Sequence, residues 1–249
     1  MPQQYPPDHT KAGIDAAISE LVIANRILAR EDVIDDFGHV SLRHPFDPGR
    51  YFLSRSRSPA NVTRDDILEF DLDGNLLGND HRSPYRERAI HGEIYRARPD
   101  VNAVTHHHAR SVLPFTMTQE PPLKPVFHMG SVIGTRIDTW DSQDEFGDTN
   151  MLVETAEQGA SLARVLGRNR VALLRAHGAV CAMPTLRQVC MVSIYLKENA
   201  ELFLNALQIT RPGYISEGEA RLASETLLND LCVDRAWDYW TARAGFAGL

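Results

Sequence analysis

The chain has 249 residues, enough to bury a sizeable core, and its 43% hydrophobic and 24% charged residues are typical of a globular protein. The formal net charge of −7 argues against a nucleic-acid partner, which needs a basic face, but is compatible with a small anionic substrate. We find no apolar stretch of about 18 residues that could span a membrane and no metal-ligand spacing among Cys181, Cys190 and Cys232. The polar, Pro-rich residues 1–10 do not resemble a signal peptide. These features predict a cytoplasmic protein without a membrane partner.

Residues 1–9 are polar and Pro-rich and are expected to form a flexible arm, and residues 10–249 a single domain. Hydrophobic periodicity and turn residues predict the elements that follow in the chain. Helices are expected at 11–30, 84–98, 109–118, 149–166, 185–207 and 216–243, and strands or extended segments at 39–44, 51–54, 63–72, 101–106, 126–133, 171–174 and 180–183. The order of these elements favours an α/β fold, in which a mixed sheet has helices on both faces.

Three successive histidines, His106, His107 and His108, end the strand predicted after residue 100. Side chains alternate between the two faces of a strand, so His106 and His108 point the same way and His107 points the opposite way. Two imidazoles on one face can bind a single ion. The alternative interpretation is an exposed polar strand end.

Two further segments offer ligands of the same kind. His177 follows an apolar run and precedes Gly178, which lets the backbone turn sharply and present the imidazole, although a histidine at a strand end is more often structural. Glu87 and His91 are four residues apart on a predicted helix and therefore share a face. Imidazoles with a carboxylate suit Zn²⁺, Mn²⁺, Fe²⁺ or Co²⁺, and the ligand types alone do not choose among these metals.

The stretch from Glu87 to His108 resembles the metal-site core of the class II aldolase/adducin family, through its Glu-x3-His and His-x-His spacing. The segment Leu173-Leu174-Arg-Ala-His177-Gly178 resembles the third-histidine motif of that family, and the similarity covers roughly residues 14–205. This resemblance implies an αβα sandwich with a central mixed, mainly antiparallel sheet. It also implies a homotetramer whose active sites lie between subunits.

The same resemblance implies one divalent metal ion per subunit, with Mn²⁺ or Zn²⁺ expected and Fe²⁺ or Co²⁺ as alternatives. The implied ligands are His106, His108 and His177. Glu87 is implied to be either a fourth ligand or the catalytic acid/base, and the sequence leaves both roles open.

Several positions depart from the sugar-phosphate aldolases of the family, which hold phosphate with glycine, asparagine and hydroxyl groups. Basic and aromatic residues replace these groups in this chain. His39 stands where the aldolases have the asparagine, Arg55 and Arg57 stand in their phosphate-binding turn, and Tyr85-Arg86 replaces a pair of serines. Arginine binds carboxylates bidentately, and Tyr and His pack against aromatic rings. We therefore predict a small anionic aromatic substrate. The alternative is that Arg55 and Arg57 face solvent. The predicted substrate contacts are His39, Ser41, Arg57, Tyr85 and Arg86.

His128 stands near the position of a tyrosine that, in the aldolases, reaches into the neighbouring subunit. An imidazole titrates near neutrality and is a good proton donor, whereas an ordinary packed histidine is the alternative. Together these changes resemble the decarboxylase branch of the family, which acts on hydroxylated aromatic or heteroaromatic dicarboxylates such as dihydroxyphthalate. The sequence thus predicts a metal-dependent carboxy-lyase in which a metal-stabilised enolate is protonated by His128 or Glu87, while Arg57 or Arg86 anchors a second carboxylate.

Three other functions remain compatible with parts of this pattern. An aldolase acting on a non-phosphorylated hydroxy-keto acid would use the same metal site. A non-heme iron oxygenase on this scaffold would be revealed by iron dependence and oxygen uptake. A non-catalytic adducin-like module is disfavoured, because all three ligand histidines are present.

Overall fold

The computed structural model describes residues 11–246, so the predicted arm at residues 1–9 lies outside the described part of the chain. The strands are β1 (His39–Arg43), β2 (Arg50–Ser54), β3 (Ile67–Asp71), β4 (Ala103–His107), β5 (Asp138–Trp140), β6 (Val171–Leu174) and β7 (Gly178–Met183). They form one seven-stranded sheet in the order β3-β2-β1-β4-β7-β6-β5. Neighbouring strands of this sheet pair antiparallel except β5 and β6, which are parallel. The predicted mixed, mainly antiparallel sheet is confirmed.

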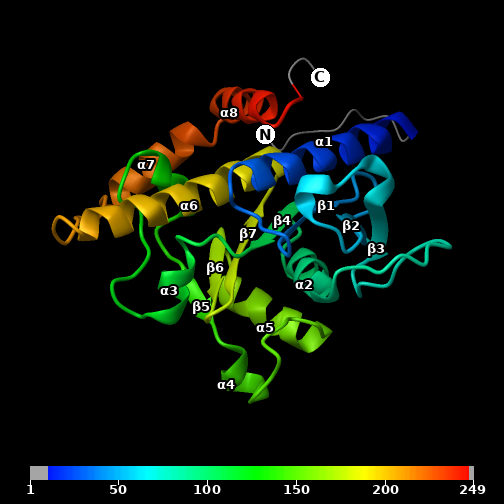
Figure 1. Ribbon diagram of the computed structural model, residues 1–249, viewed down its shortest axis with the longest axis horizontal. Helices are drawn as coiled ribbons and strands as arrows, with labels where there is room; N and C mark the ends of the chain where they lie inside the picture. The colour runs from blue at the N-terminus through cyan, green and yellow to red at the C-terminus, as the bar shows by residue number, and fades with distance from the viewer. Residues whose placement is uncertain (1–10, 247–249) are drawn as a thin grey trace.

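The helices are α1 (Lys11–Arg30), α2 (Ala89–Ala97), α3 (Leu113–Met117), α4 (Ser142–Phe146), α5 (Ala156–Leu166), α6 (Leu186–Leu207), α7 (Glu217–Leu227) and α8 (Asp230–Arg243). Helices α1 and α6 cover one face of the sheet, and α8 packs on their outer side (Figure 1). Helices α2 and α5 cover the other face and pack against each other. Each interface has its own apolar core, so the αβα sandwich is confirmed.

The helix predicted at 84–98 begins later than expected. A bridge between Arg55 and Pro84 extends the sheet region, and Tyr85 is still extended at φ −60° and ψ 142°. A short 3-10 turn, η3 (Arg86–Arg88), follows, and Glu87 in it has non-helical angles of φ −86° and ψ 22°. Glu87 and His91 therefore do not share one helical face, and that prediction was wrong.

Other boundaries differ for local reasons. Residues 126–133 contain no strand and end in a 3-10 helix, η4 (Met129–Ile133). The helix predicted from residue 149 begins only at Ala156, because Thr155 caps it by accepting from the backbone N–H of Gln158. The long C-terminal helix is divided into α7 and α8, since Asn229 caps α8 through the N–H of Cys232. The helix predicted at 109–118 is reduced to α3, and the short elements β5 and α4 were not predicted.

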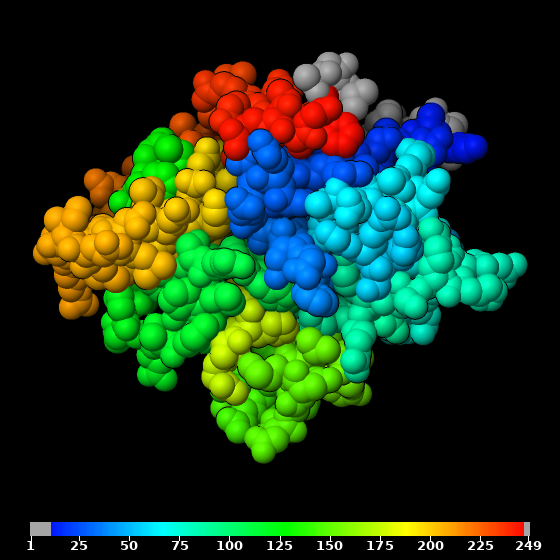
Figure 2. All heavy atoms as spheres, viewed as in Figure 1, coloured from blue at the N-terminus to red at the C-terminus, as the bar shows by residue number. Residues whose placement is uncertain are grey.

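The segment after α1 crosses the surface between the cyan region of β1–β3 and the green middle of the chain (Figure 2). A turn at residues 31–32 and two bends, at residues 33–34 and 36–37, lead it from the end of α1 into β1. This path brings the segment against the end of β4, where the candidate site lies. Among residues 11–246, no helix is long and apolar enough to cross a membrane.

Candidate metal centre and substrate pocket

Four side chains converge beyond the end of β4, and their ligand atoms all lie within 4.8 Å of one another: Glu87, His106, His108 and His177. His106 Nε2 lies 3.0 Å from His108 Nε2 and 3.6 Å from Glu87 Oε2. His177 Nε2 lies 3.8 Å from the same carboxylate oxygen. A tetrahedral zinc ion with bonds of about 2.0–2.1 Å places its ligand atoms about 3.3–3.4 Å apart. The side chains therefore fit a single ion of this size.

Strand alternation explains the two histidines from one segment. His106 belongs to β4 and His108 follows its end, and both imidazoles reach the cluster. His107 lies on the opposite side, where it is fully buried and its Nε2 is 3.9 Å from Cys181 Sγ. The prediction that His107 points away from the cluster agrees with this placement.

His177 comes from the tight connection between β6 and β7, in which Leu174 pairs with Gly178. The residue with a left-handed backbone is Ala176, at φ +51°, and not the glycine as we expected. Gly178 is required for another reason: a Cβ there would lie 2.3 Å from the carbonyl oxygen of His107. The close approach of β7 to the end of β4 is what brings His177 to the cluster.

Hydrogen bonds orient three of the four candidate ligands. Nδ1 of His108 lies 3.1 Å from the carboxylate of Asp35, and Nδ1 of His106 lies 3.2 Å from the carbonyl oxygen of Ala179. Glu87 Oε1 accepts from the backbone N–H of Val153 at 3.0 Å. Such bonds direct the opposite ring nitrogen, or the second carboxylate oxygen, toward a metal. Asp35 was not among the residues that the sequence analysis singled out, although a carboxylate is a common orienting partner of a ligand histidine.

Burial sets the protonation states in this cluster. It lowers the pKa of His106 well below the usual value and that of His177 to about 4, so both imidazoles are neutral at pH 7, as ligation requires. Burial also raises the pKa of Glu87 to about 7. A divalent cation would favour its ionised form, because the carboxylate is then paired with positive charge.

A pocket of about 670 Å³ opens above the cluster. Four of the five predicted substrate contacts line it: His39, Arg57, Tyr85 and Arg86. Phe37 and Leu152, which the sequence analysis did not single out, add apolar surface. The pocket therefore combines metal-binding groups, aromatic rings and two guanidinium groups within one cavity.

The arginines in and near the pocket differ in how closely a carboxylate of the protein pairs with them. Arg57 Nη1 lies 3.3 Å from Asp66 Oδ1, whereas Arg55 makes a closer contact of 2.6 Å with the same oxygen and lies outside the pocket lining. Arg86 pairs with Glu154 and its side chain is 71% exposed. Asp66 thus pairs more closely with Arg55 than with Arg57. Of these two arginines, Arg57 is the more available cation for an anionic ligand.

The fifth predicted contact, Ser41, is placed differently. It is completely buried behind His39 and does not line the pocket. Its hydroxyl is occupied by His91 Nδ1 at 2.6 Å and by Tyr95 Oη at 2.7 Å. Direct contact between Ser41 and a substrate is therefore contradicted, because the pleat of β1 turns this side chain toward α2.

His128 is exposed and lies away from the metal cluster of its own chain. It lines a separate groove between η4, α6 and α8, together with Tyr195 and Tyr239. Its predicted approach to the cluster of a neighbouring subunit concerns an assembly and stays a prediction. The exposure of this side chain does not favour the alternative of an ordinary packed histidine.

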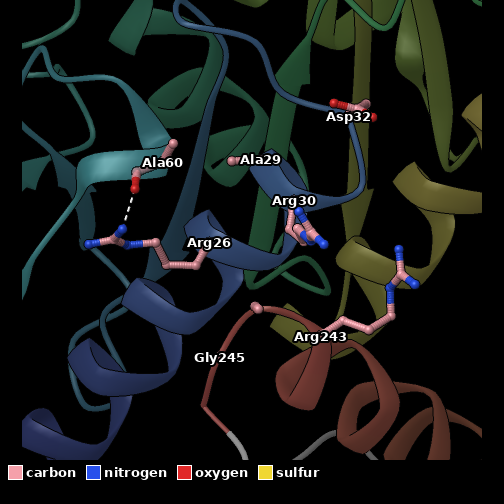
Figure 3. A pocket seen from close by; sticks show the side chains of 8 residues that line it. Arg26, Ala29, Arg30, Asp32, Ala60, Arg243 and Gly245 are labelled. Atoms are coloured by element: carbon pink, nitrogen blue, oxygen red, sulfur yellow. Dashed lines mark hydrogen bonds between the residues drawn. The ribbon is translucent and has the colours of Figure 1, made fainter.

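A third hollow lies between the ends of α1 and α8 and is lined by Arg26, Arg30 and Arg243 (Figure 3). Arg26 donates to the carbonyl oxygens of Ala60 and Val62, and Arg243 is paired with Glu31. These guanidinium groups stabilise the fold locally, so the pocket above the histidines is the stronger candidate site.

Comparison with known proteins agrees with this geometry. The chain is 28% identical over 247 residues to decarboxylase tropJ of Talaromyces stipitatus, covering 90% of this chain and 92% of that protein. It is 30% identical over 215 residues to the 3,4-dihydroxyphthalate decarboxylase of Arthrobacter keyseri, covering 82% of each. The fold matches the L-fuculose 1-phosphate aldolase from Glaciozyma antarctica with a TM-score of 0.78 at 20% identity, covering 96% of this chain and 92% of that one. The profile of the class II aldolase and adducin N-terminal domain matches residues 19–204, and the chain belongs to that family.

Proposed function

We propose that this protein is a metal-dependent decarboxylase of a hydroxylated aromatic or heteroaromatic carboxylate. The observation that carries the proposal is the pocket itself, in which Phe37, His39 and Tyr85 lie beside Arg57 and the His/Glu cluster. Aromatic side chains can pack on an aromatic ring, while a guanidinium group recognises a carboxylate. The similarity to two decarboxylases supports the same reaction class.

The candidate ligands His106, His108, His177 and Glu87 would hold a divalent ion, with Zn²⁺ or Mn²⁺ proposed. Such an ion supplies a Lewis acid that stabilises negative charge on a substrate oxygen. The reaction converts an aryl carboxylate and one proton into an arene and CO₂, so the protein must bind the anion and deliver one proton to carbon. Arg57 would anchor a second carboxylate of the substrate, and Arg86 would contribute at the exposed rim.

The proton donor is proposed to be His128 of a neighbouring subunit. This side chain is exposed and therefore available to a partner, but it lies away from the cluster in its own chain. The proposal requires a homo-oligomer, and we infer a tetramer from family membership. Glu87 is the rival donor, because its buried carboxyl lines the pocket beside the candidate metal ligands.

The test is turnover of ortho-hydroxy aromatic carboxylates in deuterated water, with CO₂ release measured and product deuterium located by NMR. Deuterium is expected at the carbon that loses CO₂. His128→Ala should lower kcat by about 10²–10⁴-fold with unchanged metal content, as for a positioned acid. Full activity of the His128 variant, or of a monomer in light scattering, would remove His128 from the mechanism.

An aldolase is the second candidate function, favoured by the hydroxyl groups of Ser56 and Ser58 in the pocket lining. These groups flank Arg57 and could bind polar groups of an aliphatic substrate. The discriminating result is the product: carbonyl fragments from a hydroxy-keto acid, with no CO₂ from any ortho-hydroxy aromatic carboxylate, would assign the aldolase reaction. Oxygen uptake that depends on iron would instead assign the oxygenase alternative.

A further inference from the structure

A row of buried polar side chains lies between β1 and α2, directly behind the pocket. His39 and Ser41 are two residues apart on β1 and face α2, while His91 and Tyr95 are one helical turn apart on α2. The exposed fractions are 1% for His39 and Tyr95 and 0% for Ser41 and His91. Burying polar groups is costly unless hydrogen bonds satisfy them, so their arrangement requires a physical reason.

The four side chains form a continuous hydrogen-bonded row. Tyr95 Oη lies 2.7 Å from Ser41 Oγ, Ser41 Oγ lies 2.6 Å from His91 Nδ1, and His91 Nε2 lies 2.7 Å from His39 Nδ1. The far end of the row is Nε2 of His39, a buried atom without a hydrogen-bond partner among the described residues. The His39 ring lines the pocket, with its centroid 4.6 Å from that of Tyr85 and 5.2 Å from that of His106.

The direction of the row follows from its first member. The single hydroxyl proton of Tyr95 can go to Ser41 at 2.7 Å or to the carbonyl oxygen of Asn102 at 3.4 Å, and the second distance is too long for a strong hydrogen bond. When Tyr95 donates to Ser41, the Ser41 hydroxyl donates to Nδ1 of His91.

The same logic continues through the two imidazoles. His91, with Nδ1 accepting, carries its proton on Nε2 and donates to Nδ1 of His39. His39 is then protonated on Nε2, the atom without a partner. An unpaired buried N–H group has a free-energy cost that a ligand acceptor would remove.

We propose that Tyr95, Ser41 and His91 are positioning residues that hold His39 with its Nε2–H directed into the pocket, where it donates to the ring hydroxyl oxygen of the substrate. The identity of that oxygen rests on the proposed decarboxylation, in which negative charge develops there as CO₂ leaves. A preoriented donor beside the metal ligands stabilises this charge, and His39 keeps its proton throughout. Ser41 thus acts through His39 and not by touching substrate.

The first test reads the tautomer and needs no turnover. Zinc-loaded protein labelled with ¹⁵N-histidine should show His39 protonated on Nε2, with its signals assigned by their loss in His39→Gln. Tyr95→Phe and Ser41→Ala should shift His39 toward a mixture of tautomers, whereas the exposed His81→Gln control should not. Protonation of His39 on Nδ1 in the unmodified protein, or an unchanged tautomer in both row variants, would overturn the inference.

The second test uses a matched pair of His91 variants. His91→Gln retains an N–H group that can donate to His39 Nδ1, whereas His91→Met does not. Calorimetric binding of 2-hydroxybenzoate to the zinc-loaded protein should weaken roughly tenfold in His91→Met and recover most of this loss in His91→Gln. Benzoate, which lacks the hydroxyl, should be affected much less.

Two outcomes of the binding test are decisive. Equal weakening for both ligands, or no recovery in His91→Gln at equal zinc content, would show that His91 has only a structural role. A protein that decarboxylates no ortho-hydroxy carboxylate, yet gives the expected tautomer and binding pattern, would refute the proposed reaction and support the positioning of His39.

Discussion

The carboxylate of Asp35 lies 3.1 Å from Nδ1 of His108, on the side of the ring opposite to the cluster. Asp35 is itself held by the backbone N–H groups of Phe37 and Gly38, which donate to its Oδ1 at 3.0 and 2.9 Å. Desolvation raises the pKa of this carboxyl, but the hydrogen bond with His108 and those from the backbone outweigh it and lower the pKa below its usual range. An ionised Asp35 therefore fixes both the orientation and the tautomer of His108.

Replacing Asp35 should weaken metal binding without removing a ligand. We expect Asp35→Asn to lower zinc affinity by about 10–100-fold, the usual effect of losing an orienting partner. Competition with a chromophoric chelator measures this affinity, and the neighbouring exposed Asp36→Asn serves as the control. Equal affinities of the two variants would contradict the role of Asp35.

Removing His108 should abolish stoichiometric metal binding. His108→Ala removes one of the three imidazoles from a site already shaped for four side chains, so the remaining two imidazoles and one carboxylate should hold the ion more weakly. Metal analysis of the purified variant should show loss of the ion, with far-UV circular dichroism unchanged because His108 lies outside the apolar cores. His107→Gln is the contrasting variant, since it should keep the metal; metal loss there instead would contradict our ligand assignment.

Arg57 is predicted to act on substrate binding. Because a carboxylate anchor contacts ground and transition states alike, Arg57→Ala should mainly raise KM and leave kcat nearly unchanged. Arg55→Ala is the matched control, as Arg55 is bound to Asp66 and does not line the pocket. Steady-state kinetics separates the two parameters, and a fall in kcat alone for Arg57→Ala would contradict an anchoring role.

Acid should destabilise the fold through its buried histidines. Burial lowers the pKa of His91 and of His107 to about 3, compared with about 6.5 in the unfolded chain. Their contribution to stability is fully present above pH 6.5 and is lost as pH falls toward 3, because the unfolded state binds protons that the folded state does not. Each group contributes a slope of up to about 1.4 kcal/mol per pH unit.

This pH dependence can be measured by urea unfolding of chelator-treated protein between pH 7 and 5. Glu87 acts in the opposite direction, because its pKa is raised to about 7 and its contribution is present below about pH 4.5 and lost as pH rises through 7. His107→Gln should therefore reduce the fall in the free energy of unfolding on acidification. A slope equal to that of the unmodified protein would mean that His107 is not buried in its neutral form.

The sequence by itself determined the features that depend on local periodicity and on motif spacing. Alternation along one strand was sufficient to separate His106 and His108 from His107, and helical periodicity predicted α1 with its observed bounds. Family resemblance supplied Glu87 and His177, and all four residues converge in the fold. These predictions succeed because side-chain direction within a strand follows from backbone geometry alone.

Only the tertiary structure decided how distant segments combine around the cluster. The sequence analysis did not single out Asp35, and it predicted Ser41 to be a substrate contact. The pairing of β1 with β4 and the packing of α2 place Asp35 behind His108 and Ser41 behind His39. The non-helical angles of Glu87 likewise occur where the chain leaves the bridge between Arg55 and Pro84 and enters α2, a contact between distant residues that helix propensity does not reveal. Such positions depend on contacts between residues far apart in the chain, which local patterns do not encode.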